Sequence, residues 1–418
     1  MNIQRKIYKK LEKHLAKKEF SIVIGPRQVG KTTLLRQLYE KLKSEEKTVA
    51  FLSFEDPDVL HQVNEHPENI FRFAPQPKSG KKVFLFIDEV QYAANPSKLL
   101  KYLFDTYAPQ LKVIATGSSA FYIDQKFTDS LAGRKIIFEM YSLDFEEFLL
   151  FKGKENLIKE LHLIKNQKEY LSKKYKEFEF LLEEYMTYGS YPAVILEQSV
   201  EYKIVLLKEI KNSFLKKDIL ESAIEHEEKF YRLLSLLASQ IGNTLNSNEL
   251  AGTLKLNEKT LSRYLFVLQK CFHIQLLKPF YQNVRKELTK MPKVYFNDLG
   301  LRNVLLNQFE NPTNRLDKGQ LLENLMYLFL RDKEGLENLR YWRTADGNEV
   351  DFVVESSYQS GYAIEVKWND DKINPVKYKK FTEAYPSFPL RYCCFKAEKI
   401  ENYILKFDVG KFTGEKTF

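Results

Sequence analysis

A glycine-rich segment near the amino terminus has the residue types and spacing of a phosphate-binding loop. It reads GPRQVGKTT and fits the pattern G-x-x-x-x-G-K-[ST]. Glycines let backbone N–H groups turn toward phosphate oxygens, and a following helix adds partial positive charge. We expect ATP here, with Lys31 at its β- and γ-phosphates and the Thr32 hydroxyl on Mg²⁺. The residues expected to bind the nucleotide are Gly25, Pro26, Arg27, Gln28, Val29, Gly30, Lys31, Thr32 and Thr33.

Two acidic residues follow a strongly apolar segment further along the chain. Residues 83–87 read VFLFI and lead directly into Asp88 and Glu89, 57 and 58 residues after Lys31. Such a run predicts a central parallel strand whose carboxyl end presents side chains to a site. We expect Asp88 to hold Mg²⁺ through water and Glu89 to orient or deprotonate the attacking water. The plainer alternative is a strand that ends in solvated acids.

A third apolar segment ends in small polar residues. Residues 111–115 read LKVIA and are followed by Thr116, Gly117 and two serines. At the tip of a neighbouring strand, Thr116 could hydrogen-bond the γ-phosphate or its water. The alternative is an ordinary turn from strand to helix in which a serine caps the helix.

These groups need a framework that brings the ends of several strands together. Strand-like segments at residues 21–24, 49–54, 83–87 and 111–115 alternate with helical segments, of which the first carries Leu34, Leu35, Leu38 and Leu42. This alternation predicts an α/β domain with a parallel sheet.

The motifs taken together resemble a known family. The segments GPRQVGKTTLL, FLFIDEVQ, ATGSSA, LAGRK and SLDFEEFL are similar, in order and spacing, to those of a large prokaryotic group of AAA-type P-loop ATPases. The resemblance implies ATP binding and hydrolysis, and it makes Arg134 a candidate finger on the nucleotide of the same or a neighbouring subunit. Action on a neighbour requires a homo-oligomer. The alternative is an arginine paired with Glu139 or lying on a surface that meets no phosphate.

The resemblance and the changes of pattern along the chain divide it into four segments. They are an ATPase core at 1–140, a small helical lid at 141–225, a winged-helix domain at 226–305 and a restriction-endonuclease-like α/β domain at 306–418. The lid segment is charged and helical, and we expect it to pack beside the nucleotide site.

The third segment has the order helix, turn, helix, strand, strand that resembles a winged helix. In such a module the second helix can enter the major groove of DNA. We expect three residues of that helix to face outward and three basic residues to lie on the wing. They are Lys259, Ser262 and Arg263, and Arg285, Lys286 and Lys290. Winged helices also bind proteins, so a protein partner stays open as an alternative to DNA.

Four charged residues near the carboxy terminus resemble the PD-(D/E)XK nuclease set. Glu323 lies in a helical segment, and Asp351 and Glu365 lie fourteen residues apart in strand-like segments, with Lys367 two residues further on. Carboxylates could hold Mg²⁺ to activate a water, while Lys367 positions or assists the nucleophile. Glu365 and Lys367 share a face of their strand because side chains alternate. The alternative is a cross-strand ion pair in a degenerate fold.

Composition limits the remaining possibilities. The 418 residues are 44% hydrophobic and 29% charged, with a net charge of +9 and three cysteines without a CxxC pair. This excludes a disulfide scaffold and a zinc finger, so we expect any metal to be Mg²⁺ held by carboxylates. The start lacks a signal peptide, and no apolar run approaches the ~18 residues of a membrane span. We expect a cytoplasmic protein without a membrane partner.

Three functions agree with these features. The first is an ATP-hydrolysing AAA-type ATPase that couples its nucleotide state to the binding of DNA or another partner. The second is an ATP-gated, Mg²⁺-dependent DNA nuclease, and the third is a regulatory ATP-binding scaffold that does not bind nucleic acid.

Overall fold

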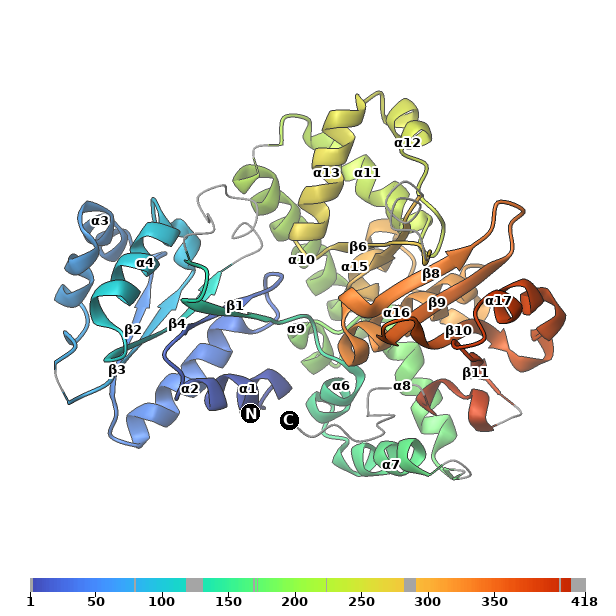
Figure 1. The fold of residues 1–418 in the computed structure, drawn as a ribbon, viewed down its shortest axis with the longest axis horizontal. Coiled ribbons are helices and arrows are strands. Elements are labelled where there is room, and N and C mark those ends of the chain that lie inside the picture. The colour runs from blue at the N-terminus through green and yellow to red at the C-terminus, as the bar shows by residue number, and fades with distance from the viewer. Residues whose placement is uncertain are drawn as a thin grey trace. The chain divides into compact units, whose positions relative to one another are not determined.

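The computed structural model describes residues 3–78, 80–117, 131–167, 170, 172–222, 224–281, 291–397 and 400–406 (Figure 1). The chain forms two compact units. The first comprises Met1–Ser142, Ser213–Glu225 and Phe266–Phe272, and the second comprises Leu143–Asn212, His226–Leu265 and His273–Phe418. No helix within the described ranges is both long enough and apolar enough to cross a membrane.

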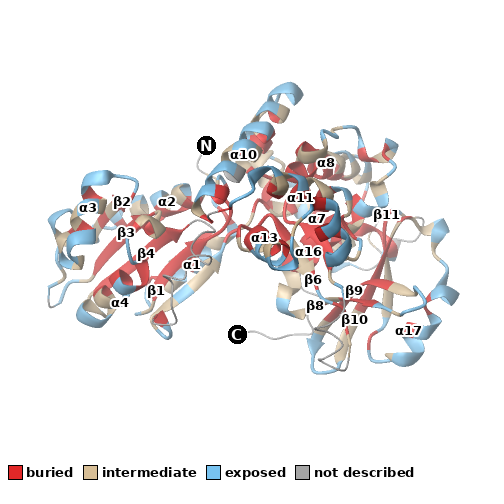
Figure 2. Cartoon of the chain, turned by 90° about the horizontal axis from the view of Figure 1, so that it is seen from above, coloured by how far each residue is buried: buried red, intermediate tan, exposed pale blue. Residues whose placement is uncertain are grey.

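The first unit is built on a five-stranded parallel sheet, which confirms the predicted α/β fold. Its strands are β1 (Phe20–Ile24), β2 (Thr48–Ser53), β3 (Val83–Asp88), β4 (Leu111–Gly117) and β5 (Lys135–Glu139). Their order is β2-β3-β4-β1-β5, and all neighbours are parallel. The central strands β1, β3 and β4 are buried along their whole length (Figure 2), as is expected of a parallel sheet covered on both faces.

Helices cover both faces of this sheet. They are α1 (Lys6–His14), α2 (Lys31–Ser44), α3 (Pro57–Glu65) and α4 (Pro96–Tyr107). The views in Figures 1 and 2 place α2 and α4 on opposite faces. Right-handed crossovers require this, because the chain moves in opposite directions across the sheet from β1 to β2 and from β3 to β4. The apolar stripe predicted for α2 is buried.

The edge strand β5 was not among the predicted strands. It pairs with β1, and its residues are half-buried or exposed. An edge strand has a neighbour on one side only, and its sequence, KIIFE, begins and ends in charged residues that are not buried.

A buried lysine lies inside the first unit. The Lys112 side chain on β4 is fully buried, donates to the backbone oxygen of Glu19 and lies 3.2 Å from Nδ1 of His14. Burial, opposed only in part by Glu19, lowers the pKa of Lys112 to about 7, and burial together with Lys112 lowers the pKa of His14 to about 4.

This lysine should make stability depend on pH. Between pH 7 and 9 the unfolded chain keeps the Lys112 proton while the folded chain loses it, so the free energy of unfolding should rise with pH. We expect Lys112 to contribute on the order of 1 kcal/mol to this rise, so that the rise in Lys112→Met is smaller by that amount. Urea unfolding at both pH values measures it, with exposed Lys101→Met as the control. An equal rise in both variants would contradict the assignment.

The second unit begins with helices and ends with a sheet. Its helices are α6 (Phe145–Phe151), α7 (Glu155–Asn166), α8 (Tyr175–Tyr188), α9 (Pro192–Leu196), α11 (Glu227–Ser239), α12 (Ser247–Leu254), α15 (Leu299–Leu306), α16 (Lys318–Glu334) and α17 (Lys379–Ala384). Two further helices, α10 (Val200–Glu221) and α13 (Glu258–Lys270), have residues in both units.

The helices expected to form a lid on the nucleotide site belong mostly to this second unit. Within that unit, helix α8 packs against α15. The buried amide of Asn303 on α15 donates to the last carbonyls of α8, those of Met186 and Thr187, at 2.8 Å each. Only the end of α10, from Ser213 onward, belongs to the first unit.

The segment expected to be a winged helix contains α12, α13 and a two-stranded antiparallel sheet. The strands are β6 (Ile274–Leu277) and β7 (Lys293–Phe296). Lys259, Ser262 and Arg263 are exposed on α13. Arg285, Lys286 and Lys290, expected on the wing, lie outside the described residues.

The carboxy-terminal sheet has four strands in mixed orientation. They are β8 (Leu339–Arg343), β9 (Glu349–Ser357), β10 (Ser360–Asn369) and β11 (Leu390–Lys396), in the order β11-β10-β9-β8. Strand β9 is antiparallel to both β8 and β10, and β9 and β10 contain the strand-like segments predicted around Asp351 and Glu365. Strand β11 is parallel to β10 and was not predicted.

Candidate functional site

The glycine-rich loop and the predicted catalytic residues meet at one edge of the parallel sheet. Residues 25–30 connect β1 to α2, and Lys31, Thr32 and Thr33 form the first turn of α2. Asp88 is the last residue of β3, and Thr116 lies next to the end of β4. Since β1, β3 and β4 are parallel neighbours, their carboxyl ends converge on the loop.

The conformation of the loop depends on its two glycines. A side chain at Gly25 would overlap the carbonyl oxygen of Met140, which follows the neighbouring strand β5. Gly30 has φ 97° and precedes α2 without offering a capping side chain. The first-turn N–H groups of α2 therefore have no side-chain acceptor at that position, and such groups can donate to phosphate oxygens.

Lys31 is enclosed by its own loop. Its Nζ donates to the carbonyl oxygens of Gly25 at 2.9 Å and Pro26 at 2.8 Å, and the side chain is buried. Burial lowers the pKa of Lys31 to about 8, although Glu89 and Asp88 oppose the shift. The loop thus holds a desolvated cation in its centre, where the phosphate groups of a nucleotide would be attracted.

The two threonines and Asp88 form a connected polar network. The Thr32 hydroxyl donates to Oδ2 of Asp88 at 2.9 Å, and the Thr116 hydroxyl donates to Oδ1 of the same carboxylate. Thr116 Oγ1 also accepts the backbone N–H of Glu89 at 2.9 Å. Thr116 therefore fixes both acids, and Thr32 and Asp88 are close enough to share one Mg²⁺ ion.

Glu89 has a special backbone conformation. Its φ of 56° and ψ of 51° lie in the left-handed region that only a few non-glycine residues adopt. The carboxylate accepts from the amide of Gln91, and its charge acts on Lys31 and Arg27. An unfavourable conformation held by neighbouring contacts is common at functional sites.

Replacing Thr116 should separate the positioning of the acids from nucleotide binding. In Thr116→Val both hydrogen bonds to the acids are lost, so we expect turnover of ATP to fall about 10-fold while the dissociation constant changes little. Steady-state phosphate release and equilibrium binding measure the two effects. Thr106→Val, at an exposed position of α4, is the control. Unchanged turnover would show that Thr116 does not position these acids.

Arg27 connects the loop to the end of α10 within the first unit. Its Nη2 pairs with Oε1 of Glu221, and its Nε lies 4.0 Å from Oδ1 of Asp218. Burial by itself would lower the pKa of Arg27, but Glu221 and Asp218 raise it above its usual value. Sequence analysis assigned Arg27 to nucleotide binding and missed both partners, which lie about 190 positions away.

Arg134 lies at the opposite edge of the sheet. It precedes β5, and its carbonyl accepts the N–H of Phe20, the first residue of β1. Its guanidinium forms two hydrogen bonds to Asp105, at 2.6 and 3.2 Å. The length of β1 therefore separates Arg134 from its own loop. Its guanidinium thus pairs with Asp105, a residue that the sequence did not suggest.

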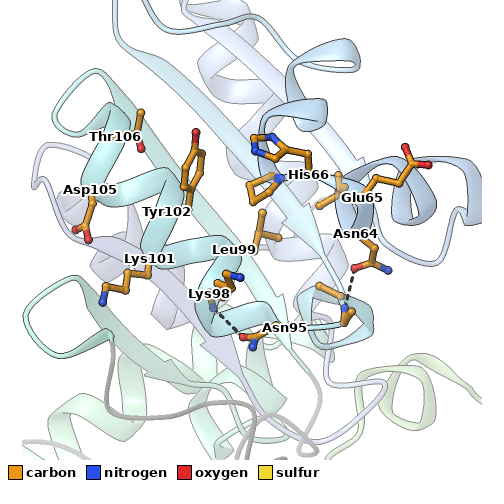
Figure 3. A pocket seen from close by; sticks show the side chains of 14 residues that line it. Asn64, Glu65, His66, Asn95, Lys98, Leu99, Lys101, Tyr102, Asp105 and Thr106 are labelled. Atoms are coloured by element: carbon orange, nitrogen blue, oxygen red, sulfur yellow. Dashed lines mark hydrogen bonds between the residues drawn. The ribbon is translucent and has the colours of Figure 1, made fainter.

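A pocket of about 760 Å³ lies elsewhere in the first unit, between the end of α3 and α4 (Figure 3). Two of its polar side chains form hydrogen bonds with backbone groups: Asn64 accepts one from the N–H of Ala94, and Asn95 accepts one from the N–H of Lys98. None of the loop residues lines this pocket.

The four residues of the nuclease-like set come together in the second unit. Ile364 on β10 pairs with Phe352 on β9, which places Glu365 beside Asp351. Asp351 Oδ2 accepts the N–H of Val366 at 2.9 Å, and Lys367 pairs with Glu365. Burial is the main reason that the pKa of Glu365 is raised to about 7, and the negative charge of Asp351 raises it further. Its Oε2 is buried and has no hydrogen-bond partner among the described residues.

A fifth residue, which sequence analysis missed, occupies this cluster. Lys293 Nζ lies 2.9 Å from Oε1 of Glu323 and 3.4 Å from Oδ1 of Asp351. The Oε2 atom of Glu365, which has no hydrogen-bond partner among the described residues, could accept a cation. The ammonium group of Lys293, however, already lies between the carboxylates of Glu323 and Asp351. With Lys293 in place, Glu323, Asp351 and Glu365 together do not fit a Mg²⁺ site.

The comparison with protein families agrees with the geometry of the loop. Residues 17–149 match the family of the AAA domain. Most of the predicted ATPase core is therefore similar in sequence to an AAA domain. Residues 179–311 and 318–403 match two domains of unknown function.

Relatives extend across most of the chain. An uncharacterized protein of Methanocaldococcus jannaschii is 28% identical over 381 residues, covering 85% of this chain and 77% of the relative. A second protein of that organism is 26% identical and covers 83% of this chain and 75% of the relative.

Solved structures are also similar to this chain. The Orc1 protein of Aeropyrum pernix, solved in complex with DNA, is 10% identical with a TM-score of 0.34, covering 73% of this chain and 94% of that chain. The replication initiator DnaA, solved with AMPPCP and single-stranded DNA, is 18% identical with a TM-score of 0.32, covering 63% and 86%.

Proposed function

We propose that this chain binds ATP with Mg²⁺ at the glycine-rich loop and hydrolyses it. The observation that carries the proposal is the position of Thr32 and Asp88, hydrogen-bonded at 2.9 Å beside the buried ammonium of Lys31. A cation that binds the phosphates, together with a hydroxyl and a carboxylate that bind the metal ion, is the set of groups that ATP–Mg²⁺ requires at one edge of a sheet. The match to the AAA domain supports the same function.

Each side chain has a separate task in this proposal. Lys31 and the first-turn N–H groups of α2 bind phosphate oxygens, while Thr32 and Asp88 hold Mg²⁺. Bound Mg²⁺ neutralises charge on the phosphates. Glu89 accepts a proton from the attacking water or orients it, and Thr116 keeps Glu89 and Asp88 in place.

Phosphate release from ATP by the full chain tests the proposal. We expect turnover that requires Mg²⁺ and stops when EDTA removes it. Tight ATP binding without turnover would favour the scaffold alternative, and the absence of both would contradict the proposal.

DNA as the coupled partner is supported by the exposed face of α13. Lys259, Ser262 and Arg263 lie there as a winged helix requires of its second helix. We expect Lys259→Glu with Arg263→Glu to weaken DNA binding and to reduce its salt dependence by roughly one unit of log slope per lost phosphate contact. Fluorescence anisotropy with a duplex between 50 and 200 mM salt measures this.

The matched control for that experiment is Lys372→Glu with Lys377→Glu, which reverses two exposed charges elsewhere in the second unit. If both double variants bind the duplex equally, α13 does not contact DNA. Binding with no salt dependence in the wild type would favour a protein partner.

A role for Arg134 as a finger would require a second copy of the chain, because the residue lies at the far edge of its own sheet. Mixing two inactive variants tests this. Arg134→Ala keeps Glu89, and Glu89→Gln keeps Arg134. Recovery of ATPase activity in the mixture is expected for a homo-oligomer that shares its sites, and no recovery would exclude action between subunits.

A further inference from the structure

Lys293 is a buried cation in the second unit that no motif predicts. It begins β7, and only 1% of its side chain is exposed. Its Nζ lies 2.9 Å from Glu323 Oε1, 2.6 Å from Glu349 Oε1 and 3.4 Å from Asp351 Oδ1. The three carboxylates come from α16 and β9 and converge on this one ammonium group.

The surrounding groups hold Lys293 in this position. Its Nζ lies 5.6 Å from the centre of the ring of Tyr341, which lies on β8 of the four-stranded sheet. The Tyr295 hydroxyl donates to the same oxygen, Glu323 Oε1, at 2.6 Å, so two groups of β7 hold this carboxylate. A Cβ atom at Gly242 would lie 2.8 Å from Glu323 Oε2, so the backbone closes the space behind that carboxylate. The ammonium group of Lys293 is therefore enclosed by the groups around it.

Three cations offset most of the negative charge of the cluster. Its four carboxylates belong to Glu323, Glu349, Asp351 and Glu365. Besides Lys293, Lys367 pairs with Glu365, and Arg343 lies 3.3 Å from Glu349. Removing the central ammonium would leave Glu323 and Asp351 buried without their cation, beside the unpaired Oε2 of Glu365.

We propose that the ammonium of Lys293 takes the place of a divalent metal ion in this cluster and prevents Mg²⁺ or Mn²⁺ from binding there. A metal ion bound by Glu323 and Asp351 would lie about 2.1 Å from the oxygens that Lys293 already contacts. The metal ion and the ammonium would then be in contact, and two cations so close repel strongly at a buried position. Removing this charge opens a divalent-cation site formed by Glu323, Asp351 and Glu365.

Binding of Mn²⁺ to the full chain without nucleotide tests the proposal, with free Mn²⁺ measured by electron paramagnetic resonance. Wild type and Asp351→Asn are expected to give the same isotherm, because neither binds Mn²⁺ at the cluster. Lys293→Met is expected to gain one Mn²⁺ per chain, and the double variant with Asp351→Asn is expected to lose it again. Any Mn²⁺ at Asp88 is equal in all four proteins.

Thermal unfolding gives a second measurement on the same proteins. Mn²⁺ should raise the melting temperature of Lys293→Met but not that of the wild type or the double variant. If Lys293→Met does not fold, Lys293→Gln replaces it. The proposal is wrong if wild-type protein binds Mn²⁺ in a way that Asp351→Asn abolishes, or if the folded Lys293 variant gains no site.

Discussion

Lys31→Met is expected to weaken ATP binding by roughly 100-fold or more, because the variant loses the ammonium group expected at the β- and γ-phosphates. Charge-assisted hydrogen bonds each contribute about 1.5–3 kcal/mol, and a lysine between two phosphates forms more than one. The substitution removes no partner from another side chain, since Nζ donates only to loop carbonyls in its described contacts.

The same variant should not be less stable than the wild type. Burial lowers the pKa of Lys31 to about 8, so the folded protein carries a poorly solvated charge at neutral pH. Methionine has similar length and no charge, and the melting temperature without nucleotide should stay the same or rise. A large fall in melting temperature would mean that weak binding reflects misfolding, and Lys31→Arg would then be compared.

Glu89→Gln is expected to bind ATP as the wild type does but to hydrolyse it about 10²–10⁴ times more slowly. The amide has the same shape and keeps the backbone N–H bonded to Thr116, but it cannot accept a proton from water. Single-turnover hydrolysis and equilibrium binding measure the two properties in one preparation.

The control for this experiment is Glu65→Gln, which removes an exposed carboxylate on α3. It should leave both properties unchanged. If Glu89→Gln hydrolyses ATP at the wild-type rate, a different residue activates the water, and the left-handed conformation of Glu89 then has another cause.

Sequence alone could predict the parts of the molecule that local pattern determines. The apolar runs of β1, β3 and β4 and the loop before α2 follow from neighbouring residues, and these elements bring Lys31, Thr32 and Asp88 together. Strand β5 was missed because it is short, only partly buried and bounded by charged residues at both ends. Its pairing with β1 in turn decides the position of Arg134.

Contacts between distant segments could not be predicted. Arg27 meets Glu221 from 194 positions away, and Lys293 meets Asp351 from 58 positions away. A single lysine before a short strand carries no pattern that distinguishes a surface charge from a buried one. Residues 141–225 were predicted to form a lid, and most of them belong to the second unit, where α8 contacts α15 and α16.

Titration of the full chain with ATP in the presence of Mg²⁺ tests the central claim most directly. The arrangement of Lys31, Thr32 and Asp88 predicts saturable binding of one ATP per chain, weaker when EDTA removes Mg²⁺ and weaker by roughly 100-fold in Lys31→Met. A wild-type chain that binds no ATP, or a Lys31→Met isotherm that coincides with the wild-type isotherm, would contradict it.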